Sequence, residues 1–194
     1  MELIKKGVKV TALIVCFLIF NISNAQNYIY IGEERFEATP TWDFALETMY
    51  GTVTKEIEVT ISKKNKGGNL LLSISDMDSR HRKITGGITI YLSDGSVIKC
   101  IDRNQKSRLN DRSYNLYNLT NSEIEQLKVT DIKEIVFSLT SFYNDIVFQN
   151  SEYYTAKNLH PKRTDTDLGK LGTHTNDYLG QYDTSNDISE LFNE

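Results

Sequence analysis

Residues 57–62 read Ile-Glu-Val-Thr-Ile-Ser and residues 69–75 read Asn-Leu-Leu-Leu-Ser-Ile-Ser, and these two stretches decide the fold class. In the first stretch apolar and polar residues alternate, which is typical of a β-strand with one buried and one solvent-facing side. In the second stretch leucine and isoleucine recur at every second position in the same way. The polar segment 63–68, which ends in two glycines, separates the two stretches. We therefore expect them to form a β-hairpin.

A second hairpin is predicted further along the chain. The β-branched segments 88–92 and 96–101 flank the pair Asp94-Gly95. Asp-Gly favours a two-residue hairpin loop, because Asp tolerates and Gly prefers a positive φ angle. Such a loop places Ile90 opposite Lys99, so a lysine stands on an apolar face. We expect a β-bulge at Lys99 to move it outward.

One short helix is predicted between later strands. The sequence Thr120-Asn121-Ser122-Glu123 has the spacing of a capping box, and it precedes the helix-forming segment 124–128. A helix this short needs a sheet to pack on. With the series of short β-branched and aromatic runs on either side, the chain predicts a mainly β fold. We expect an antiparallel β-sandwich-like domain of about seven or eight strands with one short packed helix.

The N-terminal segment predicts export. Three lysines precede an unbroken apolar run at 10–20, and Ser23-Asn24-Ala25 follows it. This pattern is typical of a secretory signal peptide, with cleavage expected after Ala25. The apolar run is shorter than the roughly 20 residues that a membrane-spanning helix needs, so an uncleaved anchor is the less favoured alternative. Only Cys100 remains after cleavage, so we expect no intrachain disulfide and a secreted or periplasmic location.

Composition divides the rest of the chain in two. We expect a signal peptide at 1–25, a β-rich domain at 26–157 and an acidic, flexible C-terminal tail at 158–194. The tail has three basic and seven acidic residues, although 187–192 are capable of forming a last helical turn that docks on the domain. The whole chain of 194 residues has a formal net charge of −4, and the predicted cleavage removes more basic than acidic residues. Bulk nucleic-acid binding is therefore not expected.

The stretch 87–157 resembles small secreted proteins of unknown function from Bacteroidota. In those proteins a YLxDGS hairpin precedes a YxLTxxEIxxLK strand and helix and a further strand. The matching residues here are 91–96, 117–128 and 135–139. The resemblance covers under half of the chain and rests on turn, cap and core residues. It implies a fold and an envelope location, and it transfers no catalytic residues.

Motifs that carry chemistry are weak in this sequence. His81, His160 and His174 are far apart and lack a zinc-ligand spacing. Cys100 lies within a predicted strand, where cysteine is usually a small core residue. No nucleophile elbow, P-loop or dinucleotide fingerprint is present. We therefore predict no catalytic residues, no metal and no cofactor.

The most specific site prediction concerns two basic loops. If the first four strands from residue 57 onward form an antiparallel meander, the loops 76–83 and 103–112 leave the sheet at the same end. Together they would form an electropositive surface suited to phosphate or carboxylate groups. The alternative is that acidic residues in the same loops neutralise this surface. The candidate ligand-binding residues are Arg80, Arg82, Lys83, Arg103, Lys106, Arg108 and Arg112.

The sequence thus predicts a non-catalytic secreted or periplasmic envelope protein, a binding or structural module for an anionic glycan or a protein partner. The alternative is a hydrolase acting on envelope polymers, which would need a cleft with converging catalytic groups. A third alternative is a small-ligand carrier whose sheet closes around an apolar cavity. The eleven tyrosines offer a stacking platform for sugars as a further alternative. The oligomeric state is left open.

Overall fold

The computed structural model describes residues 27–48, 51–75, 81–109, 112–143, 146–147, 152–161 and 178–193. The two helices in this part of the chain are α2 (Asn121–Leu127) and α3 (Thr184–Asn193). The strands are β1 (Asn27–Ile31), β2 (Glu34–Ala38), β3 (Trp42–Thr48), β4 (Gly51–Lys63), β5 (Gly68–Ser75), β6 (His81–Leu92), β7 (Val97–Cys100), β8 (Lys106–Leu109), β9 (Arg112–Leu119), β10 (Ile132–Tyr143), β11 (Ile146–Val147), β12 (Glu152–Lys157), β13 (His160–Pro161) and β14 (Tyr178–Gly180).

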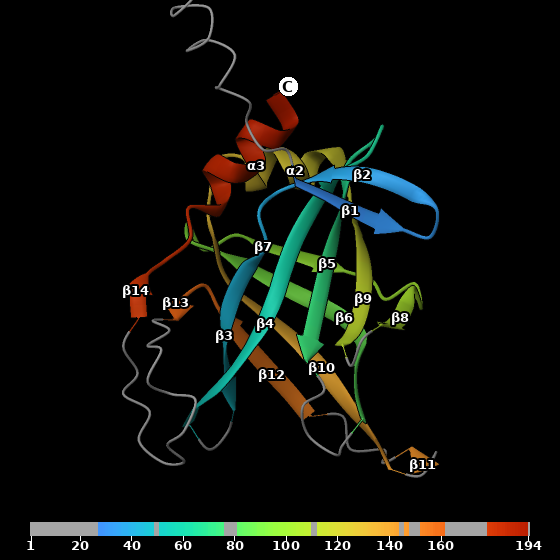
Figure 1. The fold of residues 1–194 in the computed structure, drawn as a ribbon. Helices are drawn as coiled ribbons and strands as arrows, with labels where there is room; N and C mark the ends of the chain where they lie inside the picture. Colours follow the sequence, from blue (N-terminus) through green and yellow to red (C-terminus); the bar gives the residue numbers. More distant parts are fainter. Residues whose placement is uncertain are drawn as a thin grey trace, which may run out of the picture.

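Twelve of these strands form one antiparallel sheet, and β13 and β14 form a small second one. The main path runs β7-β6-β10-β12-β3-β4-β5-β9-β8, with β1, β2 and β11 attached beside it. The sheet curls so that β4 and β5 lie in front of β6 and β7, with the core between these two layers (Figure 1). The predicted mainly antiparallel β fold with a packed helix is confirmed, but the strands outnumber the seven or eight expected.

The hairpin predicted from 57–62 and 69–75 is confirmed as β4 and β5. Ile57 stands opposite Ile74, and Lys63 stands opposite Gly68. Ile57, Val59 and Ile61 are fully buried, as the alternation of residue types predicts. Beyond this hairpin the predicted meander is wrong, because β5 pairs with β9 and not with β6.

The second predicted hairpin is present as β6 and β7, but its register is one residue away from the prediction. Ile90 stands opposite Ile98, and Thr89 opposite Lys99. The Leu92 amide bonds the Ser96 carbonyl at 3.0 Å, so the loop has three residues, with Gly95 at φ 88°. A three-residue loop with glycine in the left-handed region is the common alternative to the two-residue turn. It turns Lys99 to solvent without a bulge at that residue.

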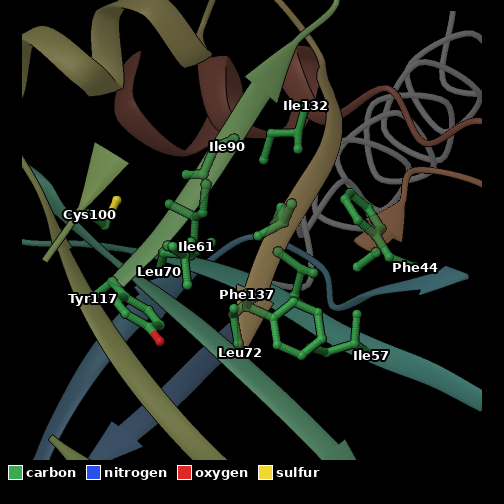
Figure 2. Packing of buried hydrophobic residues seen from close by; sticks show 14 of the residues in the cluster. Phe44, Ile57, Ile61, Leu70, Leu72, Ile90, Cys100, Tyr117, Ile132 and Phe137 are labelled. Atoms are coloured by element: carbon green, nitrogen blue, oxygen red, sulfur yellow. The ribbon is translucent and has the colours of Figure 1, made fainter. Parts of the chain in front are cut away.

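The core fills the space between the two layers of the curled sheet. Its largest fully buried side chains include Trp42, Phe44, Phe137 and Tyr117. Figure 2 shows Phe44 and Phe137 from opposite layers together with Ile57, Leu70 and Leu72 of the front layer. Full burial of one such aliphatic or aromatic side chain contributes about 1.5–3 kcal/mol. The buried hydrophobic cluster of the described residues draws on strands of both layers.

Helix α2 begins with the predicted capping box. The Glu123 amide donates to Thr120 Oγ1 at 3.3 Å, and the Thr120 amide donates to Glu123 Oε2 at 2.6 Å. This arrangement satisfies two backbone donors. Ile124 and Leu127 point into the core at one end of the curled sheet, where α3 also lies (Figure 1).

Helix α3 extends the ordered domain past Lys157, where the sequence predicted its end. The helical turn expected at 187–192 is present and begins earlier, at Thr184. Ile188 and Thr184 have no exposed surface, and Asn158 is 1% exposed, so these residues belong to the domain. Residues 162–177 of the predicted tail lie outside the described residues.

The predicted signal peptide at 1–25 also lies outside the described residues. Within the part of the chain that the structure describes, no helix has the length and the apolar character needed to cross a bilayer.

Candidate functional site

The candidate site is built around strand β9, which pairs with β5 and β8 in the sheet and whose inner side chains bond the first half of β6. Strand β8 pairs with β9, so that Arg108 stands opposite Ser113 and Lys106 opposite Asn115. On the inner side, the Asn115 amide group donates to the Ile84 carbonyl at 3.4 Å, which brings β6 alongside β9. Strands β6 and β9 are far apart in the sheet order but are in contact here. We call the region where β6, β8 and β9 come together the seam.

Side-chain hydrogen bonds, and not backbone pairing between strands, join β9 to β6 at the seam. Strand β7 pairs with β6 only from Ile88 to Tyr91, so the earlier part of β6 lacks β7 as a partner. The Tyr117 hydroxyl donates to the Gly86 carbonyl at 3.1 Å, and the Gly86 amide donates to Asp102 Oδ2 at 2.9 Å. Buried backbone groups need such partners. Gly86 has a φ of 74°, which glycine adopts without strain, and it lies in a two-residue bulge of β6 opposite β10.

The electrostatics of the seam interior favour neutral groups. Burial, and to a lesser degree the Asp102 carboxylate, raises the pKa of the Tyr117 hydroxyl well above its usual range. The Asn115 side chain donates to that hydroxyl at 2.8 Å, while its own Oδ1 is buried and has no hydrogen-bond partner among the described residues. The interior of the seam is therefore a neutral hydrogen-bonded cluster whose protons stay in place at physiological pH.

Five of the seven predicted site residues lie on the three strands of the seam. Arg82 and Lys83 belong to β6, Lys106 and Arg108 to β8, and Arg112 to β9. Arg103 lies in the connection from β7 to β8 and is exposed, and Arg80 lies outside the described residues. The meander that suggested this grouping is wrong. The strands that carry them are near one another instead because β8 pairs with β9 and the Asn115 and Tyr117 side chains of β9 bond backbone carbonyls of β6.

Arg112 is engaged within the fold. Its guanidinium contacts Glu58 Oε1 at 2.6 Å, and its Nε donates to Ser73 Oγ at 2.9 Å. These partners lie on β4 and β5, so Arg112 crosses the outer surface of three neighbouring strands. Arg112 is thus paired with a carboxylate of the same chain, and its binding of an external anion stays a prediction.

The alternative that acidic loop residues neutralise the basic ones stays a prediction. Asp102 is directed at the backbone, since its carboxylate accepts from the amides of Gly86 and Asn104 at 2.9 and 2.7 Å. Asp102 therefore stabilises the turn at Asn104 and binds the backbone of β6 at Gly86. Asp76, Asp78 and Asp111 lie outside the described residues.

Cys100 is unsuited to nucleophilic chemistry. The thiol is 5% exposed, and burial together with the nearby Glu123 carboxylate raises its pKa to about 12. A reactive cysteine needs the opposite shift. Figure 2 places Cys100 within the core, which agrees with its predicted role as a small core residue.

The histidines that the structure describes also lie apart from one another. His81 begins β6, and the His160 ring packs against the Tyr182 ring at 4.7 Å between centroids. Among the described residues no three His, Cys, Asp or Glu side chains converge as metal ligands would. His174 lies outside that part of the chain.

Sequence reasoning did not find a hollow beside β10 and β12. It encloses about 290 Å³. Asn158, at its floor, is saturated, because it donates to the Ile132 and Tyr182 carbonyls and accepts from the Tyr182 amide. No sequence signal marks the hollow, since its lining comes from three segments that are far apart in the sequence. Its lining residues are Lys133, Glu134, Lys157, Asn158, Leu159 and Gln181.

Comparison of the chain with protein-family models, with curated proteins and with solved structures found no match.

Proposed function

We propose that the protein is a non-catalytic binding module, secreted or periplasmic, that holds an anionic polymer of the cell envelope. The observation that carries the proposal is the placement of Arg82 and Lys83 on β6 and of Lys106 and Arg108 on β8, two strands that both contact β9. We call these four residues the basic seam residues. The ligand class is a carboxylated or sulfated glycan, or an acidic protein segment, because guanidinium and ammonium groups recognise such anions.

Two further observations support a binding module. The net charge of the chain is −4, so four basic residues on two strands that both contact β9 stand out from an acidic background and would steer anions to this region. Arg112 on β9 is already paired with Glu58, so we leave it out of the proposed ligand-binding residues. The hydrolase alternative gains no support from Cys100, whose thiol is buried and protonated.

Charge reversal tests the proposal. In one variant the four basic seam residues are changed to glutamate, and Arg112 is kept so that its ion pair survives. A matched control carries the same change in net charge at exposed lysines elsewhere. The test substitutions are Arg82→Glu, Lys83→Glu, Lys106→Glu and Arg108→Glu. The control substitutions are Lys64→Glu, Lys66→Glu, Lys99→Glu and Lys133→Glu.

Binding to dextran sulfate and to polygalacturonate is measured by titration calorimetry at two salt concentrations, with circular dichroism to check folding. We expect the test variant to weaken binding about tenfold, which corresponds to about 1.4 kcal/mol, and to reduce its salt dependence. The control should bind nearly as the natural chain does. Equal losses in both variants, or no binding of either polymer by the natural chain, would contradict the proposal.

A further inference from the structure

The hollow beside β10 and β12 is lined by segments that hydrogen bonds hold in place. Its floor residue, Asn158, is 1% exposed. The Asn158 side chain donates to the Ile132 carbonyl of β10 and bonds both the carbonyl and the amide of Tyr182. The Asn158 amide donates to the Lys133 carbonyl at 3.0 Å. The three segments around the hollow are thus joined by the chain's own bonds, as in a preformed binding pocket.

A β-bulge brings two charged residues of β10 to this hollow. The register between β10 and β6 shifts between Ile132 and Glu134, so Lys133 is an extra residue in the ladder. Lys133 and Glu134 both line the hollow, although successive side chains of a regular strand point to opposite faces. Ile132 and Ile135, on either side of them, are buried in the core. The bulge therefore places a cation and an anion, adjacent in the sequence, at one pocket.

The charges of the hollow match a small zwitterion. Lys133 and Lys157 contribute ammonium groups to the lining, and Glu134 contributes a carboxylate. Among the described residues, neither Lys133 nor Glu134 has an ion-pair partner. Glu134 is half-buried, which strengthens its attraction for a cation relative to a fully exposed carboxylate. A ligand carboxylate at Lys133 and a ligand ammonium at Glu134 would each gain a charge-assisted hydrogen bond.

The size of the hollow and the rest of its lining narrow the ligand further. A volume of about 290 Å³ is at the lower end of the range for small-molecule pockets, which suits a ligand the size of one amino acid. Leu159 is half-buried and offers an apolar contact to a ligand side chain. Gln181 is exposed, and its amide group is able to donate and to accept. This combination favours an amino acid with an apolar side chain.

We propose that the hollow binds a free α-amino acid with an apolar side chain, whose carboxylate is bound by Lys133 and whose ammonium group is bound by Glu134. This binding site is independent of the proposed function, because the basic seam residues lie on β6 and β8 and the hollow lies beside β10 and β12.

Leucine and two analogues, each lacking one of its charged groups, test the ligand class. Isocaproate lacks the ammonium group, and isopentylamine lacks the carboxylate. Binding is followed by nuclear magnetic resonance through the backbone amide signals of Asn158 and Gln181 in the isotope-labelled chain, up to the solubility limit of leucine. We expect L-leucine or D-leucine to shift these signals at concentrations about tenfold lower than either analogue requires. Unmoved signals, or equal shifts with isocaproate, would overturn the inference.

Substitutions of the two charged residues test their assigned roles. Glu134→Gln should weaken leucine binding about tenfold and leave isocaproate binding unchanged, whereas Lys133→Gln should weaken the binding of both. The matched controls Glu33→Gln and Lys99→Gln, at exposed positions elsewhere, should change neither. Circular dichroism checks that each variant is folded. A folded Glu134→Gln variant that binds leucine as tightly as the Glu33→Gln control does would contradict the proposal.

Discussion

The N-terminal hairpin of β1 and β2 and the C-terminal helix lie at the same end of the curled sheet (Figure 1), but they are attached in different ways. The hairpin is joined through Ala38 and Thr39, at a few backbone positions. Helix α3 is joined through buried side chains: Ile188 has no exposed surface, and Trp42 Nε1 donates to Asp187 Oδ2 at 2.8 Å. A terminal segment becomes part of the domain when it buries apolar surface and its polar groups find partners there.

The start of α3 illustrates the second condition. Asp131 Oδ1 accepts the Ser185 amide at 2.8 Å, and the Thr184 hydroxyl accepts the Ile132 amide at 2.9 Å. Asp183 Oδ1 accepts the Asn186 amide at 3.1 Å. The free amides at a helix start are thus satisfied partly by the loop before β10.

The largest effect should come from cavity formation under α3. Ile188→Ala removes a fully buried side chain and should lower the free energy of unfolding by about 2–5 kcal/mol. The matched change Ile29→Ala, in the half-buried hairpin, should lower it by about 1 kcal/mol or less, because less apolar area is involved. Urea unfolding of both variants measures the difference. Equal losses would mean that the two segments are attached with equal strength.

A smaller effect should come from the polar anchors. Asn158→Leu leaves the Ile132 and Tyr182 carbonyls and the Tyr182 amide without their partner, which should lower the free energy of unfolding by about 2–3 kcal/mol. Thr39→Val removes a single bond to the Ile61 amide and should lower it by about 1 kcal/mol. The same urea experiment compares them. If Thr39→Val were the more damaging change, the hairpin attachment would be the stronger of the two.

The smallest effect should be the pH dependence of the Asp187 contact. Burial is the main cause that raises the pKa of this carboxyl, with additions from Glu190, Asp183 and Asp131, while the Trp42 bond opposes them. The folded chain therefore binds its proton more tightly than the unfolded chain does. The contribution to stability is present at acidic pH and is lost as pH rises through the folded pKa.

The substitution Asp187→Asn keeps an oxygen acceptor for Trp42 and removes the charge. We expect it to raise the thermal midpoint slightly at neutral pH, and the gain should vanish in acid. Thermal unfolding at several pH values measures the gain, and Glu33→Gln, at the exposed turn between β1 and β2, is the control. A loss of stability at neutral pH would show that the ionised carboxylate contributes more than its burial removes.

Local features of this fold could be predicted from sequence, and distant ones could not. The alternation at 57–62 and the capping box at Thr120 depend on neighbouring residues, and both are confirmed. The register around Gly95 was wrong by one residue because Asp-Gly fits both a two-residue and a three-residue loop. The hydrogen bond from Trp42 to Asp187 joins residues 145 positions apart, and no sequence periodicity predicts it.

The candidate site follows the same rule. The grouping of basic residues was visible in the sequence, but the strands that carry them were placed by an incorrect meander. The pairing of β5 with β9 depends on long-range contacts and decides which of these residues are engaged. Arg112 could not be separated from the others without knowing that Glu58 lies across two strands from it.

The β1–β2 hairpin and α3 lie at the same end of the sheet (Figure 1), and this decides which surface faces outward when the protein is attached to a support. The start of β1 and the end of α3 lie at this shared end of the curled sheet. A surface or a fusion partner attached close to either element therefore leaves the opposite end of the sheet exposed to solvent.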